Sequence, residues 1–187
     1  ADVPYSVASG IGFYESTEIT ALLNLFRALA DPSDERALYA ALRSPLFGLT
    51  DDTLAQLKLH DDSLWEALAT SEHQELQDTY EYLQEWRHLA GVGNEEPAGF
   101  DGSWAAYLTR ILEDTGYLVS ASADERPQQA MANVEKFREQ LRGWSDDGVR
   151  SLTTLVCRIE RRIELGWRES EADTTGEGIQ SLTTPDN

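Results

Sequence analysis

The residues best suited to hold a ligand form a glycine turn ahead of a predicted helix. Pro45 ends the preceding helix, Gly48 permits a sharp turn, and Thr50 with Asp51 and Asp52 favours the start of the next helix. Amides at a helix start attract anions, and a glycine lets the backbone approach one. A capped turn that only joins two helices fits the same residues, and the two aspartates place negative charge where an anion would sit. Both interpretations stay open for the candidate residues Phe47, Gly48, Leu49, Thr50 and Thr53.

The rest of the chain offers little further chemistry. Neither lysine, Lys58 or Lys136, follows a glycine, so the phosphate-binding loop of an ATP site is absent. Adjacent carboxylates are common in a chain with 34 acidic residues, and most fall at predicted helix starts, which they can cap. The three histidines lack the spacing of paired metal ligands. We therefore expect no catalytic residue, no metal and no cofactor in these residues.

The charge balance indicates a protein adapted to high salt. The net charge is −19, and only two of the 15 basic residues are lysine. Surface carboxylates hold water, while molar salt screens their repulsion to within about 3 Å. A halophilic source is our interpretation, and an ordinary acidic protein is the alternative. Acidity does not exclude a role with DNA, because long-range repulsion nearly vanishes in such salt.

The hydrophobic pattern predicts a mainly α fold of one compact domain. We expect about seven or eight helices, with a short strand remnant at the N-terminus over Val3–Val7 and a second one near the C-terminus. The segments 130–144 and 149–163 have seam spacing and should form an antiparallel pair, with Gly143 as a possible helix cap. Residues 169–187 are acidic, lack helical periodicity, and are expected to be mostly flexible.

Cysteine usage and hydropathy suggest where the protein works. The single cysteine, Cys157, is predicted on the apolar side of a helix, which excludes a disulfide framework and favours a reduced, cytoplasmic setting. No apolar run is long enough to cross a membrane. The chain begins with Ala1 and not with methionine, so we expect it to be an excised part of a longer protein.

Two stretches carry a resemblance to a known family. Val3-Pro4-Tyr5 leads into a glycine bend, and the run from Arg43 to Leu49 reads Arg-Ser-Pro-Leu-Phe-Gly-Leu. Together they resemble superfamily 1 DNA helicases of the UvrD/RecB type, in the RecB/AddA-like form. The likeness extends through the runs 113–117 and 133–136 to about Trp167, with departures at Ser9, Ser16, Thr20 and Ala21. The residues of the motor-domain motif would be Gly10, Gly12, Phe13, Tyr14 and Glu18.

This resemblance implies a division of the chain into three parts. Residues 1–30 would be a remnant of the second motor domain, 2A. Residues 31–168 would form a helical accessory domain like the inserted 2B domain, and residues 169–187 would lead back to the motor. ATP and magnesium would bind elsewhere in the parent enzyme.

The resemblance also implies a non-catalytic role. The region would contact duplex DNA near the fork and regulate the motor of an ATP-dependent helicase/exonuclease that acts in unwinding, recombination and repair. In relatives, amides of the turn matching Phe47 to Thr53 contact duplex phosphates, although Phe47 here replaces an arginine and Thr50 a glycine. The alternatives are a free-standing acidic adaptor that binds a protein partner, or a DNA mimic.

Overall fold

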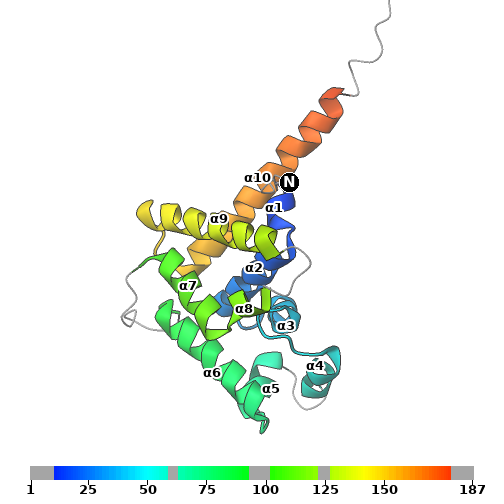
Figure 1. Ribbon diagram of the computed structural model, residues 1–187, viewed down its shortest axis with the longest axis vertical. Helices are drawn as coiled ribbons and strands as arrows, with labels where there is room; N and C mark the ends of the chain where they lie inside the picture. Colours follow the sequence, from blue (N-terminus) through cyan, green and yellow to red (C-terminus); the bar gives the residue numbers. More distant parts are fainter. Residues whose placement is uncertain (1–10, 59–62, 93–101, 122–126, 178–187) are drawn as a thin grey trace, which may run out of the picture.

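The helices account for most of the computed structural model (Figure 1), which describes residues 11–58, 63–92, 102–121 and 127–177. Within these ranges there are ten helices and no strand. The mainly α prediction is confirmed, while the strands predicted over Val3–Val7 and near the C-terminus lie outside the described residues, as does Gly10. The helices are α1 Ile11–Tyr14, α2 Thr17–Ala30, α3 Glu35–Arg43, α4 Asp51–Lys58, α5 Leu64–Thr70, α6 Gln74–Leu89, α7 Trp104–Asp114, α8 Tyr117–Ala121, α9 Pro127–Asp146 and α10 Leu152–Glu177.

Helix α2 is the centre of the core. It packs against α3, α6, α9 and α10, so it is covered on most sides. Its large apolar side chains, including Leu25, Phe26 and Leu29, are completely buried. This burial explains why the sequence of α2 is apolar beyond a single stripe. The predicted count of seven or eight helices was too low, because α1 and α8 span only four and five residues and show no periodicity.

Buried aromatic side chains join the second half of the chain to this core. The indole of Trp86 donates to Asp114 Oδ2 at 2.9 Å, and the hydroxyl of Tyr107 donates to the Trp86 carbonyl at 2.9 Å. Trp104 Nε1 donates to the Val149 carbonyl at 2.8 Å. Burial raises the pKa of Tyr107 far above its usual value, so this hydroxyl stays protonated. Trp86, Trp104 and Trp144 are all buried in this core.

The packing of α9 and α10 differs from the predicted antiparallel pair. Helix α9 packs mainly on α7 and α2, whereas α10 packs on α2 and α1 and crosses α9 at an angle (Figure 1). Seam spacing identifies which face is buried but not which helix covers it. Gly143 lies inside α9, and Gly148, with φ +85°, makes the turn instead.

Helix α10 also runs farther than its apolar pattern. It continues to Glu177, past the point near residue 168 where the apolar spacing stops, and its end projects from the body (Figure 1). Cys157 lies on an exposed side of α10, so its predicted apolar placement was wrong. No described helix is both long and apolar enough to cross a membrane.

Candidate nucleic-acid interface

The candidate turn lies between α3 and α4, at the end of the molecule away from the projecting end of α10 (Figure 1). Gly48 is exposed with φ +67°, a conformation that favours glycine, and a Cβ there would meet no atom within 4 Å. Thr50 is exposed, and its hydroxyl lies 2.9 Å from that of Thr53. Leu49 instead points into the core, and Phe47 is half-buried against Trp86, with ring centroids 6.0 Å apart.

Internal hydrogen bonds use most amides of this turn. Phe47 N and Gly48 N donate to the Ser44 carbonyl, and Leu49 N donates to the Leu42 carbonyl. The amide of Thr53 donates to Thr50 Oγ1 at 3.2 Å. These four amides are therefore hydrogen-bonded within the chain and are not free to bind an anion. Asp51 and Asp52 are the first two residues of α4, and their amides have no acceptor within the helix.

Carboxylates surround the turn and shape its electrostatics. Asp51 accepts from the hydroxyl of Tyr39 at 2.9 Å, and it pairs with Arg43 through an Nε–Oδ1 distance of 2.7 Å. This bond to Asp51 raises the pKa of Tyr39. Glu75, Asp78 and Asp114 line a groove of about 410 Å³ beside Phe47. Arg43 is therefore a nearby cation that the sequence pattern did not indicate, because its pairing with Asp51 arises from the fold.

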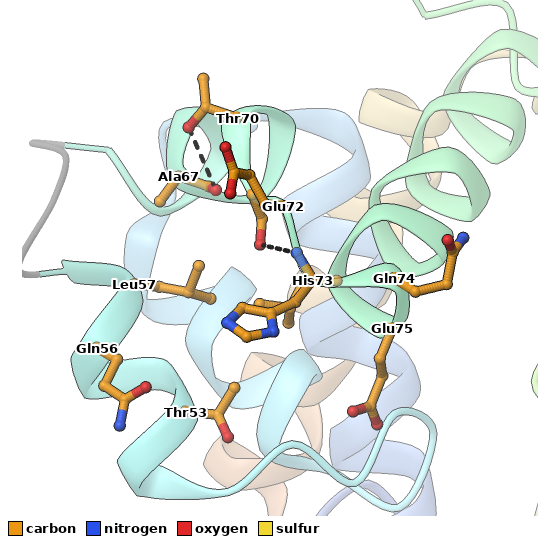
Figure 2. A pocket seen from close by; sticks show the side chains of 11 residues that line it. Thr53, Gln56, Leu57, Ala67, Thr70, Glu72, His73, Gln74 and Glu75 are labelled. Carbon is orange, nitrogen blue, oxygen red and sulfur yellow. Dashed lines mark hydrogen bonds between the residues drawn. The ribbon is translucent and has the colours of Figure 1, made fainter.

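A second hollow opens on the other side of the turn. This cleft of about 620 Å³ lies between α4, α5 and the start of α6, and Thr53 stands at its edge (Figure 2). The imidazole of His73 extends across it towards α4, while Gln56 and Leu57 form the facing wall (Figure 2). The lining is mixed, with Thr70, Ser71 and Glu72 among its polar residues and Leu57 and Leu76 among its apolar ones.

The motif residues near the N-terminus meet α9, more than 100 positions later in the chain. Glu18 is 8% exposed and accepts a hydrogen bond from Asn133 Nδ2 at 2.5 Å. The hydroxyl of Tyr14 donates to Gln140 Oε1 at 2.9 Å. The ammonium of Lys136 lies 4.5 Å from the ring centroid of Phe13, within cation–π range.

These contacts form one junction, made by Phe13, Tyr14 and Glu18 with residues of α9 at helical spacing. Gly12, also in the motif, is exposed in α1, and a Cβ there would meet no atom within 4 Å. Burial raises the pKa of Tyr14, which the positive charge of Arg162 on α10 partly offsets. Sequence reasoning placed Glu18 and Asn133 in separate local motifs and did not predict that they bind each other.

The described residues contain no group of three or more histidine, cysteine or acidic side chains arranged to hold a metal ion. His73 and His88 lie exposed on different parts of α6 and its N-cap, and His60 lies outside the described ranges.

Comparison with known proteins gives relatives for this chain. No protein-family model matches it. Proteins named as a subunit of ATP-dependent helicase/nuclease, from Bacillus mycoides strain KBAB4, Bacillus cereus strain B4264 and Bacillus thuringiensis strain Al Hakam, are each 29% identical to it over 188 aligned positions. The chain resembles a segment of a helicase/nuclease subunit. The alignment covers 94% of this chain but only 14% of each relative.

These similarities support the resemblance to helicases of the UvrD/RecB type, and in particular its RecB/AddA-like form. They extend over nearly all the described helices, so they include the candidate turn and the junction between α1 and α9.

Proposed function

We propose that this chain is the non-catalytic, 2B-like accessory region of an ATP-dependent DNA helicase/exonuclease. The similarity to helicase/nuclease subunits over 94% of the chain carries this proposal. The parent enzyme would hydrolyse ATP with magnesium at motifs outside these residues, and it would act in unwinding, recombination and repair. The partners of this region would be duplex DNA near the fork and the remaining motor domains, in the cytoplasm.

The positions of the first and last helices support an inserted region. Helix α1 packs directly against α10, so the chain enters and leaves the helical body on the same side (Figure 1). An insertion needs this arrangement, because both ends must connect to one host domain. In this proposal, residues 1–30 belong to motor domain 2A, residues 31–168 to the accessory domain, and residues 169–187 to the return.

The junction between α1 and α9 links the motif to the accessory helices. It joins the motif residues Phe13, Tyr14 and Glu18 to Asn133, Lys136 and Gln140 of the accessory helices. A buried hydrogen bond and a cation–π contact fix the orientation of α9 on the motif. The accessory region would thereby sense the position of the motor.

The turn from Phe47 to Thr53 is the proposed duplex contact. Because the amides of Phe47, Gly48 and Leu49 are used internally, the contact would use the hydroxyls of Thr50 and Thr53 and the first amides of α4, which the small, exposed Gly48 would let a phosphate approach. Arg43 would add a positive charge when it exchanges Asp51 for a phosphate.

The test is Gly48→Asp in the intact parent enzyme at molar salt. Added negative charge at the turn should weaken duplex binding about tenfold while single-strand-stimulated ATP hydrolysis stays unchanged. Gly116→Asp is a matched control, since Gly116 is also exposed, has φ +61° and has no atom within 4 Å of a Cβ. Fluorescence anisotropy with a labelled duplex and an ATPase assay give the two readouts.

Equal loss of both activities in Gly48→Asp, or loss of neither, would count against the turn as a DNA contact. Equal weakening by Gly116→Asp would show a general effect of charge. The wider proposal fails if the gene's reading frame lacks a Gly-Lys-Thr motif upstream of this region.

A further inference from the structure

The positive charge of this acidic chain is concentrated in its last two long helices. Residues 127–166 carry seven basic and six acidic side chains, whereas residues 11–121 carry six basic and 20 acidic ones. Helices α9 and α10 are therefore close to neutral over this range, while the rest of the described body is strongly negative. A polyanion that approaches this molecule meets the least repulsion along these two helices.

Three arginines lie on one side of α10. Arg158, Arg161 and Arg162 are exposed and stand at positions i, i+3 and i+4, so their side chains leave the helix within about 6 Å of one another along its axis. Leu165, about one helix turn farther along the same side, is 50% exposed. We call the three arginines the arginine face of α10.

The ion pairs of these arginines leave part of their positive charge available to bind an anion. Arg161 has no ion pair among the described residues. Arg158 pairs with Asp147 through an Nη2–Oδ2 distance of 2.7 Å, but both side chains are about half exposed, and such a pair contributes little. Arg162 lies next to Tyr14 and so connects the face to the α1 junction.

The acidic side chains of α10 between positions 158 and 166 do not neutralise this face. Glu160 is held by Arg27 of α2, with Nε and Oε1 2.9 Å apart, which leaves Glu164 against three arginines. The guanidinium group binds phosphates with two parallel hydrogen bonds, and it is more weakly hydrated than an ammonium group. An arginine-only cation set on a helix that projects from the body therefore suits a charged backbone.

We infer that the arginine face of α10 is a second nucleic-acid contact, which binds phosphates of the DNA backbone. This inference rests on the proposed function and adds a contact on α10, separate from the Gly48 turn between α3 and α4. Phosphate contacts of this kind carry no base readout, so binding is independent of sequence.

The experiment compares two double variants of the whole chain. Arg158→Glu/Arg161→Glu alters one paired and one unpaired arginine of the face. Arg142→Glu/Arg110→Glu is the matched control, because Arg142 on α9 is exposed without an ion pair in the described part and Arg110 is exposed and paired with Asp114 at 2.7 Å. Both variants change the net charge by the same amount.

Binding of a labelled duplex and of a labelled single strand is measured in potassium chloride from about 0.2 M to 2 M, with circular dichroism as a check on folding. The face variant should bind about tenfold more weakly, with a salt slope lower by about two, while the control stays within about twofold of wild type. A larger loss with the duplex assigns the contact to duplex backbone, and a larger loss with the single strand assigns it to that strand.

Equal weakening by both double variants, or by neither, overturns the inference. If Gly48→Asp weakens duplex binding while the face variant does not, the proposed function stands and only the arginine contact is wrong. If the wild-type chain binds neither DNA at any salt concentration at which it is folded, both the turn and the arginine face fail as DNA contacts.

Discussion

Glu18 and Asn133 show what single residues contribute to this fold. Both are almost completely buried, and their hydrogen bond spans 115 positions of the chain. Gln129 also donates to Asn133, so the amide is held from two sides. Leaving a buried carboxylate without a hydrogen-bond donor costs more free energy than the hydrogen bond itself contributes to stability.

Replacing Asn133 should therefore destabilise the protein strongly. We expect Asn133→Ala to lower the free energy of unfolding by about 2–3 kcal/mol, because Glu18 loses its donor while it stays buried. Urea unfolding at molar salt measures the change. In a double-mutant cycle, Glu18→Ala and Asn133→Ala should show a coupling of about 1–2 kcal/mol. Additive effects would mean that the two side chains do not stabilise each other.

Residue roles could be predicted from the sequence only where they depend on local pattern. The buried positions of Trp86, Trp104 and Trp144 follow from the apolar spacing of their helices. The ion pair between Arg43 and Asp51, and the bond between Glu18 and Asn133, could not be predicted in this way. They depend on how helices pack, and a single sequence does not record packing partners.

At the scale of elements, two glycines near the end of α9 have opposite roles. Gly143 lies inside the helix with open space where a Cβ would lie, whereas Gly148 has φ +85° in the turn that follows. An interior glycine weakens a helix through backbone entropy, while a left-handed position disfavours every residue with a Cβ.

The same substitution should therefore have opposite effects at the two sites. Gly143→Ala should raise the free energy of unfolding by about 0.5–1 kcal/mol, and Gly148→Ala should lower it by about 1 kcal/mol. Thermal and urea unfolding of both variants give the comparison. A destabilised Gly143→Ala together with an unaffected Gly148→Ala would restore Gly143 as the helix cap.

Helix positions were easier to predict than helix neighbours. The long helices follow from periodicity, but α1 and α8 are too short to produce one, and the predicted pairing of α9 with α10 was wrong. Helix α2 contacts both α9 and α10, since its apolar surface extends around most of the helix. The candidate turn was located correctly as a turn, while the internal use of its amides was not foreseen.

At the scale of the whole molecule, the distribution of charge decides how the stability of the fold depends on salt. Residues 11–121 carry 20 acidic and six basic side chains around an apolar core, so their repulsion opposes the compact state. Screening shortens the range of this repulsion from about 30 Å at 0.01 M salt to about 3 Å at 1 M. The halophilic interpretation of the composition leads directly to a test.

Dialysis from molar to millimolar salt should remove much of the helical signal in circular dichroism, because unscreened carboxylates repel one another. Return to molar salt should restore it. A non-ionic osmolyte at matched osmolality is the control, since it stabilises compact states without screening charge. A spectrum that does not change with salt would contradict a halophilic origin.

The exposed position of Cys157 has a practical consequence. It is the only thiol in 187 residues, and it lies on α10 near the arginine face. A maleimide dye would thus label one known site without any change to the sequence. Its labelling rate, in this chain alone and in the proposed parent enzyme, would report directly whether another domain covers that side of α10.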